Sequence, residues 1–361
     1  MRVLLAGGGT GGHLFPAVSI AEALREHGVS DVAFAGRAEG IEGRVLPPLG
    51  WRFFAISAQP LRRSLSPFAV WALWRTVSDA HRILRAFAPD VLVATGGYVA
   101  AGVVIAQALR RGKVVLHEQN AIPGRTNCWL ARWARRVCIT FEGTARYFEQ
   151  SRCVRTGLPV RRQLLQARTE RQHACASLGL EADQRVLFVI GGSQGARQLN
   201  EWTQEMLPAL KTAGVQVMHQ VGERHASEWQ EHVQEPGYRW FAFLDAQQLG
   251  LALSAADFVL SRAGASTLSE IALFGKAALL VPYPYAYADH QWYNAQELAR
   301  GGGALVFRES ELDAQRLLRK ILELMRNDSI LQEMGERNRR WAIEDAAERV
   351  VQVVMEVAAA P

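Results

Sequence analysis

The sequence predicts an α/β protein built from two similar domains, each with a parallel sheet. Short β-rich runs alternate with helical patterns, as in residues 3–6, 16–27 and 32–35, and this order is typical of βαβ units. The alternation breaks near residues 157–162 and begins again with the β-rich run 185–190. A chain of 361 residues is also longer than one ordinary core needs. Two domains are therefore expected, and the cleft between such domains favours ligand sites.

The predicted elements follow in the same order along both domains. The first helix is expected to begin at Pro16, which suits a first turn, and to end at Gly28, which tolerates a left-handed cap. Further strands are predicted at 91–94, 114–117 and 137–140 in the first domain and at 215–220, 258–260, 278–281 and 304–307 in the second. After the last strand only helical pattern remains. The predicted domains are 1–158 and 159–337, with a terminal helix, 338–361, packed back on the first domain.

Composition and charge narrow the classes of partner. The chain is 49% apolar and 21% charged, a balance that supports large cores and argues against disorder. A net charge of +6 and a pI near 9.4 favour anionic partners, which include nucleotides, nucleic acid and acidic lipid headgroups. The four cysteines are too widely spaced for a paired zinc motif and suggest no disulfide framework. A reducing cytosol fits this pattern.

The hydropathy of the chain predicts neither export nor a membrane span. The chain opens with a short strand and glycines, without the apolar stretch and cleavage site of a secretory signal. The uncharged run 91–109 nearly has the length of a membrane span, but it contains Gly96, Gly97 and Gln107. We interpret this run as a buried strand, a glycine loop and a helix.

The first glycine-rich loop, GGGTGGH at residues 7–13, lies between a predicted strand and a predicted helix. Its backbone amides and the helix dipole would favour an anion or a developing negative charge. The loop also matches the loose G-x-G-x-x-G dinucleotide fingerprint, but the next strand ends at Gly36 and Arg37 without the acidic residue that holds a ribose. An NADP-binding protein remains an alternative interpretation, because NADP could tolerate Arg37. A phosphate-binding P-loop is disfavoured because its Lys-Ser/Thr pair is missing.

Two candidate catalytic residues follow strand ends in the first domain. His13, at the junction of loop and helix, could take a proton from an acceptor hydroxyl or could simply cap its helix. In the loop HEQN at residues 117–120, Glu118 is a second candidate base or an orienting residue. Asn120 could hydrogen-bond sugar hydroxyls or an amide, and the alternative is a purely structural loop.

Three motifs of the second domain predict a nucleotide-sugar site. The loop GGSQGA at 191–196 suits a diphosphate, which Ser193 and the loop amides could bind. The segment RAGASTLSE at 262–270 is another glycine loop leading into a helix, and Glu270 could grip a ribose diol. The segment DHQWYN at 289–294 mixes polar and aromatic groups, as sugar sites do. Its Trp292 and Tyr293 could instead be core residues of the following helix.

The stretch 61–86 places aromatic and apolar residues among arginines. Such a mixture suits an anionic membrane surface. The competing interpretation, which the residues alone favour slightly, is an ordinary amphipathic helix with core aromatics and solvated arginines, and nucleic-acid binding is a weaker third. The residues concerned are Leu65, Phe68, Trp71, Trp74 and Leu84, with Arg62, Arg63, Arg75, Arg82 and Arg85.

Taken in order, GGGTGGHLFP, TGGY, HEQN, GLPVR, GGSQGA, RAGASTLSE and DHQWYNA resemble the motifs of the MurG family of peptidoglycan N-acetylglucosaminyltransferases. The resemblance spans almost the whole chain. It implies a GT-B fold, in which two Rossmann-like domains with parallel sheets face each other across a cleft. It also implies an inverting transfer of N-acetylglucosamine from UDP-N-acetylglucosamine to the muramyl 4-hydroxyl of lipid I, which gives lipid II.

The resemblance also assigns roles to particular residues. On the acceptor side, Thr10, Gly11 and Gly12 would border the reacting groups, and His13 is the leading candidate base, with Glu118 the second. For the donor, it implies sugar contacts by Asn120 and by Gln291 or His290, uracil contacts by Arg161 and the Leu244 backbone, a diphosphate contact by Ser193, a ribose contact by Glu270, and a nucleotide lining of Gly264, Ala265, Ser266, Thr267, Leu268 and Ser269. The chain departs from the family at Leu158, where asparagine is usual, and at Trp292 and Tyr293.

The resemblance implies partners as well. We expect the anionic inner-membrane surface, on its cytoplasmic face, to be contacted peripherally through Leu65, Phe68, Trp71, Trp74 and Arg75. Proteins of cell-wall synthesis or division are further implied partners, and nucleic acid is not. We expect neither a cofactor nor an essential metal, because no Asp-x-Asp pair lies in a suitable loop. The rival interpretations are another GT-B transferase, acting on diacylglycerol or a small natural product, an NADP-binding reductase, and a non-catalytic nucleotide-sugar-binding protein.

Overall fold

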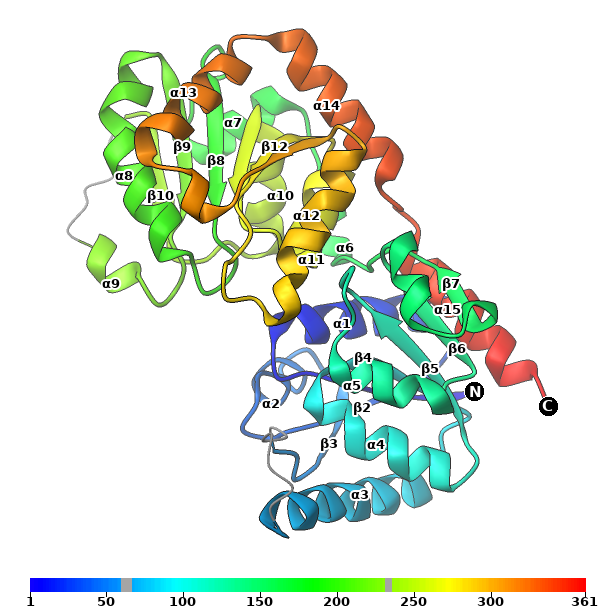
Figure 1. Cartoon of the computed structure of the whole chain (residues 1–361). Coiled ribbons are helices and arrows are strands. Elements are labelled where there is room, and N and C mark those ends of the chain that lie inside the picture. Colours follow the sequence, from blue (N-terminus) through cyan, green and yellow to red (C-terminus); the bar gives the residue numbers. More distant parts are fainter. Residues whose placement is uncertain (60–66, 231–235) are drawn as a thin grey trace. The chain divides into compact units, whose positions relative to one another are not determined.

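The computed structural model describes residues 1–59, 67–230 and 236–361, with backbone only for 67–70. The chain divides into two compact units (Figure 1). Unit 1 comprises Met1–Val160 and Asp345–Pro361, and unit 2 comprises Arg161–Glu344. Each unit has its own sheet and its own hydrophobic core.

Unit 1 holds a parallel sheet with the strand order β3-β2-β1-β4-β5-β6-β7. The strands are β1 (Arg2–Gly7), β2 (Asp31–Gly36), β3 (Arg52–Ala55), β4 (Val91–Gly96), β5 (Lys113–Glu118), β6 (Arg136–Ile139) and β7 (Cys153–Arg155). The central strands β1, β4 and β5 are buried over almost their whole length because helices cover both faces of the sheet. Sequence patterns identified β1, β2, β4, β5 and β6 but missed the short β3 and β7.

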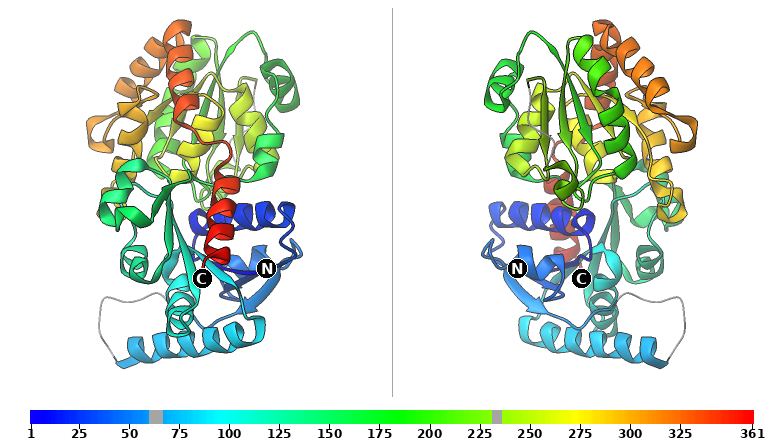
Figure 2. Two further views of the ribbon diagram at one scale, coloured as in Figure 1. Left: turned by 90° about the vertical axis from the view of Figure 1, so that its right-hand side faces the viewer. Right: turned by 90° about the vertical axis from the view of Figure 1, so that its left-hand side faces the viewer.

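Alternate residues of β1 enter two different cores. Val3 and Leu5 pack with α1 (Gly11–Glu26) and α15 (Ala346–Ala359), whereas Leu4 and Ala6 pack with α3 (Pro67–Phe87) and α4 (Gly97–Leu109). Figure 2 shows α15 beside α1 on one face of this sheet. The smaller helical elements of unit 1 are α2 (Ile41–Val45), α5 (Arg125–Leu130), η1 (Ala131–Trp133), η2 (Glu142–Tyr147) and η3 (Gln150–Arg152).

Unit 2 repeats this plan with the strand order β10-β9-β8-β11-β12-β13, also parallel. Its strands are β8 (Arg185–Ile190), β9 (Val215–Gln220), β10 (Tyr238–Phe241), β11 (Phe258–Ser261), β12 (Ala277–Leu280) and β13 (Ala304–Val306). Its helical elements are α6 (Arg162–Gln166), α7 (Arg171–Leu178), α8 (Arg197–Thr212), α9 (Ala226–Trp229), α10 (Ala246–Ala255), α11 (Ala265–Leu273), η4 (Tyr287–Asp289), α12 (His290–Arg300), η5 (Glu309–Glu311), α13 (Ala314–Met325) and α14 (Asp328–Trp341). The edge strand β10 was not predicted.

Two helices differ from the sequence-based expectation. Helix α1 begins at Gly11 and contains Pro16, so the predicted start at Pro16 was wrong by about a turn and a half. Pro16 lies in the second turn, where it removes the backbone hydrogen bond to the carbonyl oxygen of Gly12. The terminal segment 338–361 is divided, because its first residues complete α14 in unit 2 and the rest forms α15 in unit 1.

The uncharged run 91–109 forms the buried strand β4, a glycine junction and the helix α4, as predicted. In the described part of the chain, no helix combines the length and the apolar content that crossing a bilayer requires.

The order of the strands determines where a site can form. In unit 1 the chain runs outward from β1 through β2 and β3 on one side, and then returns to add β4 on the other side of β1. In unit 2, β8 lies in the same way between β9 and β11. Ligands of parallel α/β sheets bind at the carboxyl edge beside such a switch point. The loops that follow β1, β4, β8 and β11 are therefore the first places to examine.

Candidate functional site

His13 lies in the first turn of α1, next to the switch point of unit 1. Its Nδ1 atom is 3.0 Å from the carbonyl oxygen of Thr95 and 3.1 Å from Oε1 of Gln119. The Thr95 hydroxyl donates in turn to the carbonyl oxygen of His13, at 2.8 Å. The imidazole is thus held by the ends of β4 and β5, which goes beyond the alternative role of capping its own helix.

The glycines after β1 and β4 allow these chain segments to meet. Gly97 has a φ of +77°, and a Cβ atom there would lie 2.5 Å from the carbonyl oxygen of Gly8. A Cβ on Gly96 would lie 3.2 Å from His13 Nδ1. Beneath the first loop, the fully buried Glu42 accepts a hydrogen bond from Gly9 N at 2.9 Å. Sequence reasoning found the TGGY motif but did not assign these glycines, Thr95 or Glu42 to the site.

Glu118 organises the loop after β5. Its Oε1 accepts from Asn120 N at 2.9 Å, and its Oε2 accepts from Asn127 Nδ2 at 2.8 Å and from Gly124 N at 3.2 Å. Burial raises the pKa of Glu118, and these donors partly offset that effect. With 1% exposure, the carboxylate is placed to shape the loop that carries Asn120. The buried Asn127 was not singled out from the sequence, because it lies in a helix beyond the motif.

In unit 2 the side chain of Gln220 connects two predicted donor contacts. The loop that contains Ser193 has a φ of +88° at Gly192, and Ser193 is exposed. Gln220 Nε2 donates to the carbonyl oxygen of Gly192 at 3.0 Å, and its Oε1 accepts from Leu244 N at 3.2 Å. The Leu244 side chain is buried, so only its backbone can serve a ligand. Gln220 carries no motif and was missed.

The predicted nucleotide loop leads into α11, whose N-cap is Gly264. Ser266 and Thr267 are partly exposed at this helix start, whereas the side chains of Ala265, Leu268 and Ser269 are buried. Glu270 follows in the second turn, with its Oε1 4.0 Å from Arg161 Nη2. Burial raises the pKa of Glu270 to about 7, although Arg161 opposes the shift. A carboxyl group with a pKa near neutrality, close to a helix start whose free amides suit an anion, is typical of a functional site.

Gln291 is attached to this loop, whereas His290 is not. Gln291 Oε1 accepts from Ala263 N at 3.1 Å and from Tyr283 N at 2.9 Å, which directs the amide so that Nε2 is its donor side. His290 Nδ1 lies 2.9 Å from the carbonyl oxygen of Tyr287 in the preceding turn. The segment before Gln291 is strained, since Ala288 and Asp289 have φ values of +49° and +55°.

The two aromatic residues after Gln291 do not belong to the core of unit 2. Tyr293 is 41% exposed, so its alternative interpretation as a core residue was wrong. Trp292 is half-buried, and the guanidinium of Arg308 lies 4.1 Å from its ring centroid. Asp289 completes this group through an ion pair with Arg308 at 2.8 Å. The group holds the strained segment in place.

Helix α3 divides its apolar residues between core and surface. Leu84 is fully buried, but Trp71 and Trp74 are 47% and 65% exposed, so the core interpretation was wrong for both tryptophans. Arg75 lies 5.4 Å from the Trp71 ring centroid. Leu65 lies outside the described residues, and of Phe68 only the backbone is described.

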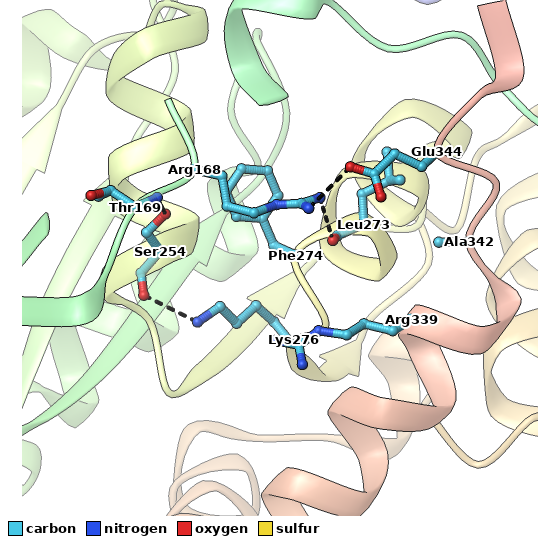
Figure 3. Close-up of a pocket in the computed structure, with 9 residues that line it drawn as sticks. All are labelled: Arg168, Thr169, Ser254, Leu273, Phe274, Lys276, Arg339, Ala342 and Glu344. Atoms are coloured by element: carbon cyan, nitrogen blue, oxygen red, sulfur yellow. Dashed lines mark hydrogen bonds and ion pairs between the residues drawn. The ribbon is translucent and has the colours of Figure 1, made fainter. Parts of the chain in front are cut away.

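A pocket of about 420 Å³ lies at the opposite, amino-terminal edge of the sheet in unit 2 (Figure 3). Lys276 Nζ donates there to the carbonyl oxygens of Ser254 and Ala256 at 3.1 and 2.8 Å, and Arg168 donates to that of Leu273 at 2.8 Å. These cations satisfy the last carbonyls of α10 and α11, a stabilising role at helix C-termini. We therefore interpret this pocket as structural.

Among the residues that the structure describes, no group of three or more histidine, cysteine, aspartate or glutamate side chains is arranged to hold a metal ion.

Comparison with known proteins identifies the class first. The glycosyltransferase family 28 N-terminal domain matches residues 3–139, and the family's C-terminal domain matches residues 186–350. With two Rossmann-like domains that carry glycine loops at their switch points, the chain is a glycosyltransferase with the GT-B fold.

The relatives then identify the family. The UDP-N-acetylglucosamine--N-acetylmuramyl-(pentapeptide) pyrophosphoryl-undecaprenol N-acetylglucosamine transferase of Moorella thermoacetica is 40% identical, over 98% of this chain and 98% of that protein. The protein of the same name from Desulforamulus reducens is 36% identical over 99% of both. The crystal structure of MurG from Acinetobacter baumannii superposes with a TM-score of 0.78 at 30% identity, covering 98% of this chain and 99% of that one. The chain belongs to the MurG family.

Proposed function

We propose that this protein transfers N-acetylglucosamine from UDP-N-acetylglucosamine to the muramyl 4-hydroxyl of lipid I with inversion, which yields lipid II for peptidoglycan synthesis. The observation that carries this proposal is that the two units hold different kinds of site residue. Unit 1 holds an oriented imidazole, His13, and unit 2 holds glycine loops, helix starts and Glu270, a set suited to a nucleotide diphosphate. The names of full-length relatives support the choice of both substrates.

Unit 2 is proposed to bind the donor. Glu270 accepts hydrogen bonds from the ribose diol, and Arg161 next to it lies on the uracil side with the Leu244 backbone. Ser193 and the amides that start α8 and α11 bind the diphosphate, with Gly264, Ala265, Ser266, Thr267, Leu268 and Ser269 lining the nucleotide. The buried Leu268 can contribute only through its backbone. Gln291, rather than His290, binds the sugar hydroxyls, because its side chain is hydrogen-bonded to the nucleotide loop.

Unit 1 is proposed to bind the acceptor and to activate it. Thr10, Gly11 and Gly12 border the reacting groups, and Asn120 contacts the donor sugar. Glu118 orients Asn120 instead of acting as the base, because its two oxygens already accept hydrogen bonds from the loop. His13 is the general base.

The reaction is a direct displacement. The acceptor hydroxyl gives its proton to His13, and its oxygen forms a bond to the anomeric carbon. The bond from that carbon to the diphosphate oxygen breaks, and its electron pair leaves with UDP. Backbone amides and helix dipoles at the loops of unit 2 stabilise the departing charge.

The membrane is the proposed location of the acceptor. We propose that α3 docks peripherally on the anionic cytoplasmic face of the inner membrane, because Trp71 and Trp74 expose apolar rings beside Arg75. Proteins of cell-wall synthesis or division are proposed as further partners on the family resemblance alone.

The test is transfer of labelled N-acetylglucosamine from its UDP donor to a synthetic lipid I analogue. We expect a lipid II analogue with inverted configuration. Tight binding of UDP-N-acetylglucosamine without transfer would overturn the assignment of lipid I as the acceptor. Absence of binding would overturn the assignment of the donor.

Membrane docking is tested by binding to vesicles that contain anionic lipid. Trp71→Ala and Trp74→Ala should weaken this binding, whereas Tyr285→Ala, which removes an 82% exposed ring of unit 2, should not.

A further inference from the structure

His117, Gln119 and His13 form one chain of hydrogen bonds in unit 1. His117 Nε2 lies 3.0 Å from the carbonyl oxygen of Gly157, and His117 Nδ1 lies 3.1 Å from Gln119 Nε2. At the other end of the amide, Gln119 Oε1 lies 3.1 Å from His13 Nδ1. His117 and Gln119 are buried, with 0% and 2% exposure, so solvent competes little for these bonds.

The direction of the first bond follows from a backbone carbonyl. Burial lowers the pKa of His117 to about 4, so its ring is neutral near pH 7 and carries one proton. The oxygen of Gly157 can only accept, which requires that this proton lies on Nε2. Nδ1 of His117 is therefore an acceptor, and the group that faces it must be the side-chain amide NH2 group of Gln119.

Two further acceptors determine the orientation of the same amide. Gln119 Nε2 lies 2.8 Å from the carbonyl oxygen of Thr95 and 3.2 Å from that of His117. A reversed amide would press its oxygen against these carbonyls and the ring nitrogen, so the assignment follows from the hydrogen-bond network. Gln119 Oε1 consequently faces His13, and the proton between them belongs to His13 Nδ1. The lone pair of neutral His13 then lies on Nε2.

We propose that His117 and Gln119 are positioning residues for His13, which hold its ring in one orientation and make Nε2 the nitrogen that takes the acceptor proton. This inference rests on the proposed transfer and on His13 as its base. Wrong orientation of a catalytic group by about 1 Å can cost about 100-fold in rate, which is the scale of the effect that such residues prevent.

A merely structural role accounts poorly for this arrangement. Burying an imidazole and an amide is unfavourable unless each polar atom is hydrogen-bonded, and apolar side chains would fill the same volume without that cost. The bonds also converge on one atom, because His13 Nδ1 lies 3.0 Å from the carbonyl oxygen of Thr95 and 3.1 Å from Gln119 Oε1. Both acceptors therefore select the same tautomer.

Other titratable groups face this loop from neighbouring elements. Glu118 ends β5 beside His117, and Glu42 of α2 bonds Gly9. Tyr98 of α4 lies near Gly9 and accepts from Arg37 at 2.8 Å. The test changes none of these groups, so they act equally in all variants.

The experiment measures kcat against pH, at saturating donor and lipid I analogue, for the wild type, Gln119→Met and Gln119→Glu. Gln119→Met removes one acceptor from His13 Nδ1, so kcat should fall about 10- to 100-fold and the acid limb should move to lower pH. Gln119→Glu puts a negative charge beside that nitrogen and favours the protonated ring, so the acid limb should move up by about one pH unit. The matched control is Gln107→Met, a buried glutamine near the far end of α4, which should leave the limb in place.

Nitrogen-15 shifts of histidine in the wild-type protein test the tautomer without any variant. We expect the His13 proton on Nδ1, and a proton on Nε2 would overturn the proposal. Acid limbs that match the wild type in both Gln119 variants would also overturn the proposal, as would an equal shift of the limb in the Gln107→Met control. A fully active His13→Ala variant would instead show that the base of the proposed function was wrong.

Discussion

Units 1 and 2 share a strand topology at their switch points but use side chains there in different ways. In unit 1, the Gln119 side chain and the backbone carbonyl of Thr95 hold the ring of another side chain, His13. In unit 2, side-chain amides hold the backbone of the loops, as Gln220 does for Gly192. An oriented imidazole suits proton transfer, whereas a rigid backbone loop suits the binding of an anion. One topology therefore supports two kinds of chemistry.

The titratable groups differ in the same way. In unit 1 burial keeps His117 neutral, with a pKa near 4, so this ring does not change its charge in the working range. In unit 2 burial raises the pKa of Glu270 to about 7, where its charge responds to small changes in pH. The pH dependence of donor binding should therefore belong to unit 2.

The largest expected effect comes from removing the imidazole of unit 1. His13→Ala should lower kcat by about 10²- to 10⁴-fold, the usual contribution of a general base, while UDP binding, which we propose for unit 2, stays unchanged. Single-turnover transfer and calorimetric titration with UDP measure the two quantities. His27→Ala, at the C-cap of the same helix, is the control and should keep its activity. A loss of UDP binding in His13→Ala would contradict the division between the units.

The next largest effect should be a change in UDP affinity on substitution of Glu270. Because the ionised carboxylate accepts ribose hydroxyls best, UDP affinity should rise with pH through about 7, and binding below this pH should release a proton. Glu270→Gln should weaken binding about 10- to 100-fold, as expected for lost hydrogen bonds to a charged group, and should abolish the pH dependence. Titrations at several pH values check this, with Glu297→Gln as the control. An unchanged pH dependence in Glu270→Gln would assign it to another group.

A third test compares the glycines of the two units. Gly97→Ala should destabilise the protein by about 2 kcal/mol or more, because a positive φ costs about 1–2 kcal/mol and the methyl group would also meet the Gly8 carbonyl. In Gly192→Ala the added methyl group would meet no atom within 4 Å, so this variant should lose only the ~1–2 kcal/mol that the positive φ costs. Urea unfolding of both variants measures the difference. Equal losses would mean that the loop around Gly8 can move away.

The sequence was sufficient for the elements whose signal is local. Apolar strands, glycine loops and helix patterns predicted the sheets, and the order of motifs predicted the family. The strands β3, β7 and β10 were missed because they lie at sheet edges, where most of their residues are partly exposed and the apolar pattern is weak. Gln220 was missed for a different reason, since its partners Gly192 and Leu244 lie 28 and 24 residues away along the chain. Contacts of this kind exist only in the folded chain.

The smallest expected effect tests Gln220 against a glutamine on the same strand. Gln220→Leu leaves Leu244 N and the Gly192 carbonyl without this partner, so the KM for the donor should rise about fivefold, or ~1 kcal/mol, with kcat at saturating donor unchanged. Gln216→Leu removes a similar pair of bonds, to the backbone of Glu181, at the other end of β9. It should cost stability without changing KM. Steady-state kinetics on both variants decide the point, because an equal rise in KM would make Gln220 a general stabiliser of unit 2 and not part of its donor site.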